Sequence, residues 1–186
     1  MTASHSAPAS DPSDDWETRV AALWAVADTL APQDLVQGID ALAAERPADD
    51  PRALFERASA RDTAGIEDGA EPLYRAALAS GRLDAFRHAR ASLQLASTLR
   101  HLGRLEESEQ LLRIQLERCR AEGAQAALHD ETRAILAFTW LAQGKPIAAA
   151  CLALETLAPH LSRYNRSTAV NARAFAMSHG EPGSAI

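Results

Sequence analysis

One pattern of small residues recurs three times at nearly constant spacing. An alanine lies seven residues before a glycine, and another small residue lies five residues after it; the three sets are Ala58, Gly65 and Ala70, then Ala96, Gly103 and Ser108, then Ala137, Gly144 and Ala149. The glycines recur at steps of 38 and 41 residues, a period typical of helical-hairpin repeats. A glycine can adopt the left-handed conformation that ends one helix before the next begins, and small residues let two helices approach closely. The pattern therefore predicts a stack of helical hairpins.

The composition also favours an all-α fold. Of the 186 residues, 47% are hydrophobic but only 5% are aromatic, and alanine is abundant. Alanine is the best helix former, and it has too little volume and β propensity for a sandwich. The chain has no alternating run rich in Val, Ile and Thr, which leaves little room for a sheet. Its length suits one compact domain or a short solenoid.

The helices and their boundaries follow from capping residues and apolar stripes. Asp14 is the expected N-cap of a first helix at about 15–30, and Pro32 is the expected start of a second helix that ends before Pro47. The predicted organisation is a disordered tail at 1–13, a degenerate hairpin at 14–46, repeats at about 51–81, 84–120 and 126–159, a capping helix at 162–177 and a flexible tail at 178–186, with 14–177 forming a single domain.

Three segments resemble tetratricopeptide repeats: LFERASARDTAGIEDGAEPLYRAAL, LQLASTLRHLGRLEESEQLLRIQLE and ILAFTWLAQGKPIAAACLALETLAPH. The small residue of the family's first helix matches Ala58, Ala96 and Ala137, whereas its large residue in the second helix is replaced by Ala153 in the third repeat. The stretches RASARDTAG, LASTLRHLGR and LAPHLSRYNRS are similar to a small group of bacterial tetratricopeptide proteins with no assigned reaction. The resemblance covers about residues 35–177. It implies a short right-handed α-solenoid with a C-terminal capping helix, acting as a scaffold that binds a protein or peptide in its concave groove.

That geometry places one stripe of each first helix in the groove, because steps of 4, 3 and 4 residues keep positions on one helical face. The stripes change from polar and partly basic to apolar along the array, which suits a peptide with an acidic segment followed by a hydrophobic anchor. The alternative is that these are ordinary solvated faces and that Phe138 is a core residue. The predicted partner-binding residues are Arg52, Ser59, Arg90, Gln94, Ser97, Arg100, His101 and Phe138.

The segment RYNRS, which follows the last repeat, has two interpretations. Arg163, Tyr164, Asn165 and Arg166 form an anion site if the N–H groups of a helix N-terminus help to bind negative charge. Alternatively, the segment is structural, with Asn165 or Ser162 capping the last helix and Tyr164 packing on the third repeat. The structural interpretation is favoured.

Motifs of catalysis and metal binding are absent from the sequence. There is no HExxH motif, no nucleophile elbow and no glycine-rich phosphate loop, so we expect neither an enzyme nor a cofactor or metal site. Cys119 and Cys151 lie far apart outside any CxxC pattern and are expected to be reduced thiols. The N-terminal sequence lacks the features of a signal peptide, and no apolar run is long enough to span a membrane, so a cytoplasmic location is expected.

Charge is distributed unevenly along the chain. The net charge of −6 combines an acidic first 50 residues with a slightly basic remainder. The acidic region is either a solubilising segment or one that screens or occupies the basic groove of its own or a neighbouring molecule. Nucleic-acid binding is a further class, but the acidic net charge and the lack of interleaved aromatic residues argue against it. The arginines that suggest nucleic-acid binding are Arg82, Arg87, Arg90, Arg100 and Arg104.

A homodimer formed through exposed helix faces is the alternative to the scaffold.

Overall fold

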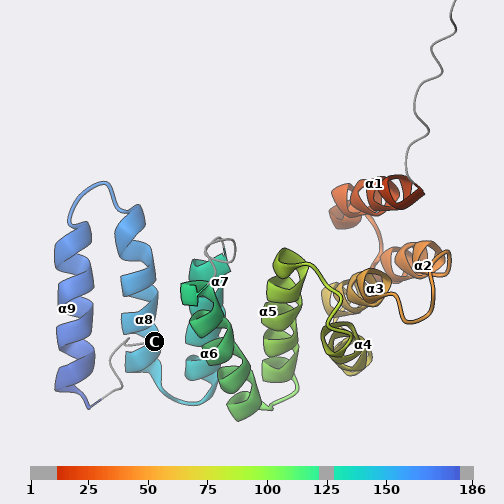
Figure 1. The fold of residues 1–186 in the computed structure, drawn as a ribbon. Helices are drawn as coiled ribbons and strands as arrows, with labels where there is room; N and C mark the ends of the chain where they lie inside the picture. The colour runs from red at the N-terminus through yellow and green to blue at the C-terminus, as the bar shows by residue number, and fades with distance from the viewer. Residues whose placement is uncertain (1–11, 122–127, 181–186) are drawn as a thin grey trace, which may run out of the picture.

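The computed structural model describes residues 12–121 and 128–180, which form α-helices joined by short turns (Figure 1). No strand occurs in these residues, so the all-α prediction is confirmed. The helices are α1 (Pro12–Ala25), α2 (Pro32–Ala43), α3 (Pro51–Thr63), α4 (Glu67–Ala79), α5 (Ala85–His101), α6 (Leu105–Ala121), α7 (His129–Ala142), α8 (Pro146–Leu157) and α9 (Asn165–Ser178), with 3-10 turns η1 (Ala27–Thr29) and η3 (Ala158–His160).

The three repeated glycines make the same turn in each hairpin. Gly65, Gly103 and Gly144 have φ angles of 71°, 75° and 74°, in the left-handed region that favours glycine. The residue after each glycine donates its N–H to a carbonyl five residues earlier, at 2.8 Å in all three turns. These bonds satisfy carbonyls at the helix C-terminus that would otherwise lack a donor. The glycine spacing therefore places α3 with α4, α5 with α6, and α7 with α8.

Small residues form the crossings inside each hairpin, as the pattern predicted. Ala58 and Ala96 are completely buried, and Ala137 is 7% exposed. The hydroxyl of Ser108 is also buried and donates to the carbonyl oxygen of Ala96 at 2.7 Å. The core runs along the stack as successive clusters, the largest of which is built around Leu112, Leu116, Leu136, Trp140 and Leu152.

The first helices of the hairpins also lie side by side along the stack. The hydroxyl of Thr98 on α5 donates to Asp62 on α3 at 2.9 Å, and the guanidinium of Arg100 on α5 lies 5.7 Å from the ring centre of Phe138 on α7. We call the surface formed by α3, α5 and α7 the first-helix face. It corresponds to the groove that the family resemblance implies.

The N-terminal hairpin differs from the prediction at both ends of its first helix. Helix α1 begins at Pro12, so Asp14 lies inside the helix rather than at its N-cap, and residues 12 and 13 do not belong to a disordered tail. Proline suits the first helical turn, where its missing N–H has no intrahelical partner. The helix ends at Ala25 and is followed by η1 instead of continuing to residue 30. Residues 1–11 lie outside the described part of the chain, as do 181–186 of the predicted C-terminal tail.

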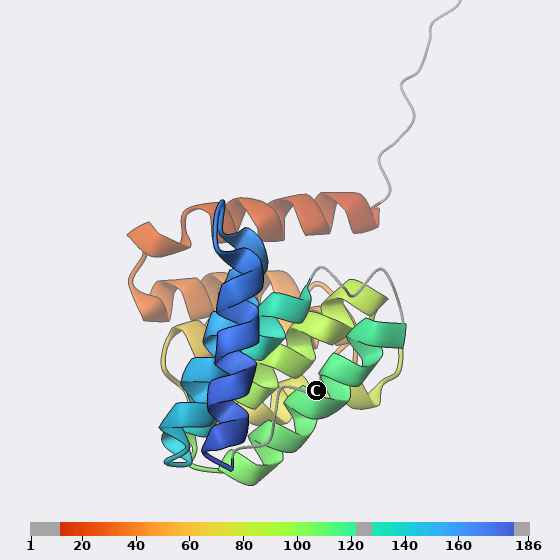
Figure 2. The ribbon, with the colours of Figure 1, turned by 90° about the vertical axis from the view of Figure 1, so that its left-hand side faces the viewer.

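Helix α1 lies alongside α2 at the N-terminal end of the stack (Figure 2). Trp16 and Val20 are almost fully buried against Leu35 and Ile39 of α2. The indole N–H of Trp16 also donates to the carbonyl oxygen of Leu42 at 2.8 Å. This packing anchors α1 to α2, and Glu17 and Trp24 of α1 reach residues of α3 and α5.

Candidate protein-interaction surface

The centre of the first-helix face carries two arginines of α5 that are stacked on aromatic rings. The guanidinium of Arg90 lies 5.2 Å from the ring centre of Phe55 on α3, and that of Arg100 lies over Phe138 on α7. Arg100 donates to the hydroxyl of Ser97 at 3.2 Å, and its buried Nε has no acceptor among the described residues. Neither arginine forms an ion pair with a described residue, although the charge of Arg90 acts on the buried carboxylate of Glu56 and opposes the effect of burial on its pKa.

The polar residues between these arginines differ in how accessible they are. Ser59 is only 2% exposed, and its hydroxyl donates to Gln94 at 3.4 Å and accepts from Tyr74 at 3.3 Å. Ser59 is therefore a packing residue rather than the groove residue that the sequence predicted. Gln94 and Ser97 are half-buried, and His101 is exposed beside Glu67, with 3.3 Å between the ring nitrogen and the carboxylate.

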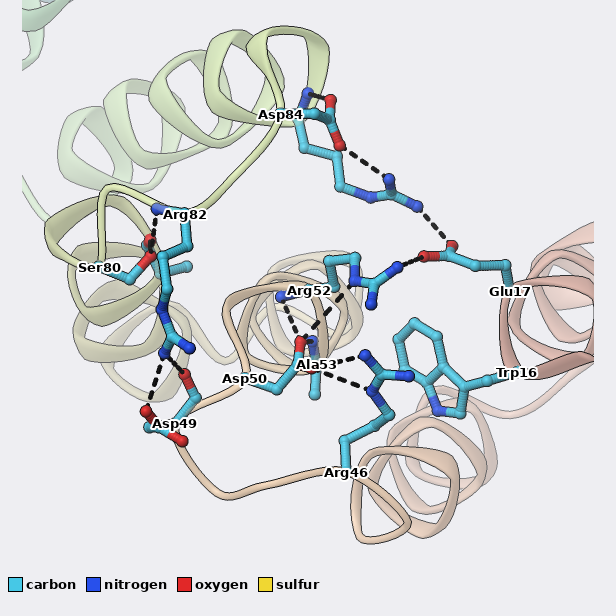
Figure 3. A network of polar contacts seen from close by, with 12 residues as sticks. Trp16, Glu17, Arg46, Asp49, Asp50, Arg52, Ala53, Ser80, Arg82 and Asp84 are labelled. Atoms are coloured by element: carbon cyan, nitrogen blue, oxygen red, sulfur yellow. Dashed lines mark hydrogen bonds and ion pairs between the residues drawn. The ribbon is translucent and has the colours of Figure 1, made fainter. Parts of the chain in front are cut away.

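The N-terminal end of the first-helix face is covered by α1 (Figure 3). Glu17 of α1 pairs with Arg52 of α3 at 3.1 Å and also with Arg87 of α5. The indole N–H of Trp24 donates to Glu56 of α3 at 2.7 Å. Arg52 is thus bound within the molecule, which differs from its predicted role in partner binding. Acidic α1 contacts basic residues of its own molecule, in line with one interpretation of the charge distribution.

Two carboxylates beside α1 have opposite pKa shifts. Burial would raise the pKa of Asp50, but hydrogen bonds from Arg46 and from the N–H groups of Ala53 and Arg52 lower it. Asp50 is the N-cap of α3, so its charge stabilises the start of that helix. Burial raises the pKa of Glu56, even though Trp24 donates a hydrogen bond to it.

The C-terminal end of the first-helix face is apolar and open. Phe138 is 55% exposed and is therefore not a core residue, and Leu141 beside it is 51% exposed. A cavity of about 490 Å³ lies between α7 and α8, and a second of about 500 Å³ lies between α8 and α9. Ala150 lines both cavities, so they adjoin each other along α8. We call these two cavities together the C-terminal cleft.

Comparison with known proteins gives one match. A family model described as a tetratrico peptide repeat matches residues 51–175. The chain belongs to the tetratricopeptide repeat family. No curated protein and no solved structure matches it significantly. Tetratricopeptide repeats generally mediate protein–protein interaction and generally act as non-enzymatic scaffolds. The matched residues contain α3 to α8 and most of α9, whereas α1 and α2 lie outside them.

Most of the arginines that suggested nucleic-acid binding are neutralised in this tetratricopeptide stack. Arg82 pairs with Asp49 at 2.8 Å, and Arg87 pairs with both Asp84 and Glu17. Arg104 pairs with Glu71 and Glu107. Only Arg90 and Arg100 of this group have no carboxylate partner in the described residues, and two charges make a poor surface for a phosphate backbone.

The RYNRS segment is exposed and does not form the predicted cap. Tyr164 has a left-handed φ of 63° at the N-cap of α9, makes no side-chain capping bond and is 78% exposed, so it does not pack on the third repeat. Asn165 is the first helical residue, and its side chain accepts from the N–H of Arg166 at 2.7 Å. Helix α9 instead packs on α8 through Ala172 and Ala176, which contact Cys151. Arg163 is exposed in the same segment.

Other chemical features of the described residues are few. No cluster of His, Cys, Asp or Glu there has a geometry for a metal ion. Cys119 and Cys151 are both buried, and burial raises the pKa of Cys119. No helix within these residues is both long and apolar enough to cross a lipid bilayer.

Sequence reasoning missed the roles of Glu17, Trp24 and Leu141. Leu141 follows Phe138 by three residues and lies on the same helical face, a signal that the sequence offered. Nothing in the local sequence indicated that Glu17 contacts Arg87, because the two are 70 positions apart and meet only when α1 packs at the N-terminal end of the stack.

Proposed function

We propose that this tetratricopeptide domain is a non-enzymatic scaffold that binds a partner protein along the first-helix face, from Arg90 to Leu141. The observation that carries the proposal is the side-by-side placement of Arg100 and Phe138. A guanidinium without a carboxylate partner lies 5.7 Å from the centre of an aromatic ring that is 55% exposed. Arginine and aromatic residues that are accessible together are typical of sites where a few side chains dominate binding.

The arrangement of charge and apolar surface defines the partner's chemistry. Because Glu17 of α1 already pairs with Arg52 and Arg87, Arg90 is the first arginine along this face without an ion pair among the described residues. The surface then becomes apolar at Phe138 and Leu141. A partner with an acidic segment next to an apolar anchor would satisfy both parts. The buried thiols of Cys119 and Cys151 suit the reducing environment of the cytoplasm, where we place this interaction.

A charge-reversal experiment tests the proposal. The double variant Arg90→Glu with Arg100→Glu should keep its helical circular dichroism, and the loss of the two ring contacts should cost only about 0.5–1 kcal/mol of stability for each contact. Its capture of partner from an extract of the source cells should fall at least tenfold at low salt, and less at high salt, because salt screens the lost attraction.

The matched control reverses two arginines of α6 instead. Arg118→Glu with Arg120→Glu makes the same change in net charge at exposed positions outside the first-helix face. This control should capture partner as well as the wild type does. Equal loss in both double variants would show that net charge alone matters and would refute binding along the first-helix face.

A homodimer is the second candidate because α9 leaves apolar side chains exposed. Val170, Phe175 and Met177 are 53%, 53% and 73% exposed on the last described helix. Size-exclusion chromatography with light scattering distinguishes the two functions. A dimer that dissociates when Met177 is replaced by Glu would support assembly through α9.

A further inference from the structure

The last helix of the stack leaves one position against α7 unfilled. Helix α3 contacts α5, and α5 contacts α7, through bonded and stacked side chains. Helix α9 packs instead on α8, where Arg173 pairs with Glu155 at 3.0 Å and Ala172 contacts Cys151. Helix α8 thus separates α7 from α9 (Figure 1). The C-terminal cleft lies along the face of α8 that α7 and α9 leave uncovered.

The shape of the C-terminal cleft suits one α-helix. Its floor on α8 carries the small exposed residues Ala150 and Ala153, with the large exposed side chains of Leu154 and Leu157 beside them. Its sides carry large exposed residues, Phe138 and Leu141 on α7 and Phe175 on α9. Helix axes pack about 8–10 Å apart when such ridges enter grooves, so a helix over the alanines would contact all three neighbours.

The chain itself does not supply a suitable occupant. Residues 1–11, 122–127 and 181–186 contain only two large apolar residues, Met1 and Ile186, at opposite ends of the chain. Helix α9 of a second copy has an exposed apolar face, but its charged residues are Arg166 and Arg173, with no acid. It would place no carboxylate next to Arg100. Charge complementarity therefore favours a different protein.

Arg100 defines which flank of the incoming helix must be acidic. Its guanidinium lies over Phe138, at the edge of the C-terminal cleft that faces α5. Its Nη2 contacts Ser97 at 3.2 Å and the ring of His101 at 2.8 Å, and no carboxylate of the described residues pairs with the guanidinium. A carboxylate on the α5-facing flank of a bound helix would supply that partner through charge-assisted hydrogen bonds.

We infer that the C-terminal cleft binds one amphipathic helix of the partner protein, with the apolar face of the helix on α8 and a Glu or Asp on its flank against Arg100. The inference rests on the proposed scaffold function and specifies the partner's structure at that site. The bound segment is helical, with apolar anchors at steps of three and four residues, rather than extended.

Selection from two peptide libraries on the full chain tests this inference. In the first library, 18-residue helical peptides carry an apolar stripe that is randomised among Ala, Leu, Ile, Met and Phe, with either Glu or Lys on one flank. The second library is identical except for a central proline, which breaks a helix. The expected result is enrichment of Glu-flanked peptides from the first library and of none from the second.

Three variants then locate the binding of the selected peptides. Ala150→Trp, or Ala153→Trp if the first misfolds, fills the floor and should raise the Kd at least tenfold by fluorescence anisotropy. Ala76→Trp changes an exposed alanine of α4 and should leave the Kd within twofold. Arg100→Glu should reverse the preference from Glu-flanked to Lys-flanked peptides.

The outcomes distinguish this inference from the proposed function. Equal enrichment from the proline library would show that the bound segment is not helical, and it would leave the scaffold function intact. Selection that yields no binder, or binders insensitive to both floor variants, would overturn the C-terminal cleft as the site. The scaffold proposal fails separately, if reversing Arg90 and Arg100 leaves partner capture unchanged.

Discussion

At the residue scale, the stack depends on single polar side chains that join one repeat to the next. Glu109 of α6 accepts from the indole N–H of Trp140 on α7 at 3.0 Å, binds Arg113 at 2.7 Å and pairs with Lys145 at 3.4 Å. Burial would raise the pKa of Glu109, but the hydrogen bonds from Trp140 and Arg113 outweigh it and lower the pKa to about 2. Glu109 thereby helps to orient α7, which carries Phe138.

Acid should weaken the contacts of Glu109 with α7 in a defined range of pH. Because the folded-state pKa of Glu109 lies below its ordinary value of 4.5, the ionised carboxylate stabilises the fold at and above pH 4.5. That stabilisation is lost as the pH falls from 4.5 towards about 2. We expect Glu109→Gln to lower the free energy of unfolding near neutral pH, and the difference from wild type to narrow in acid. Urea denaturation across that pH range measures the difference.

Glu106 provides the control, because it is an exposed glutamate on the same helix with no ion pair to a described residue. Glu106→Gln should change the free energy of unfolding little at any of these pH values. A Glu109→Gln difference that stays constant down to the lowest pH would contradict the assigned role of the carboxylate.

The residues that could be predicted from sequence are those with local signals. Gly65, Gly103 and Gly144 end their helices by left-handed turns, and each turn lies within six residues of the chain. The burial of Ala58 and Ala96 follows from the same local geometry. The sequence predicted that Arg52 and Ser59 bind a partner, but they contact Glu17 and Gln94, which come from other helices. Long-range contacts of this kind have no spacing rule in a single sequence.

At the element scale, the two terminal elements differ from regular repeats in opposite ways. Helix α1 closes the basic end of the first-helix face through Glu17 and Trp24. Helix α9 packs on α8 and η3 and leaves the apolar end open. The sequence predicted α1 from its apolar stripe and α9 from the need to cover the end of the array, but neither argument specifies the neighbour against which the helix packs.

Removal of α9 should destabilise the C-terminal repeat. Deleting residues 162–186 would uncover Ile147 and Cys151 and remove Arg173 from the buried carboxylate of Glu155. We expect a lower melting temperature and aggregation, because terminal elements of solenoids must cover the core. Circular dichroism melts and size-exclusion chromatography measure the two effects. A truncated chain that remains monomeric and equally stable would show that α9 is not the cover of the stack.

At the scale of the whole molecule, the first-helix face is divided into three parts. Its start is occupied by α1, its centre carries Arg90 and Arg100 without carboxylate partners, and its end is apolar at Phe138 and Leu141. The polar-to-apolar change was predicted from the stripes of three helices. The closure of the basic end was not, since it depends on how the N-terminal hairpin docks. The C-terminal end of the first-helix face is therefore more accessible to a partner than its N-terminal end.

The most direct test of the account is an oxidative footprint of the full chain, alone and with its captured partner. Hydroxyl radicals modify exposed side chains, and a bound protein protects those it covers. We predict protection of Phe138 and Leu141, which are 55% and 51% exposed in the free protein. Ile66 and Ile114, which are 45% and 41% exposed outside the first-helix face, should react equally in both samples. Protection of Ile114 with unchanged reactivity at Phe138 would contradict binding along the first-helix face.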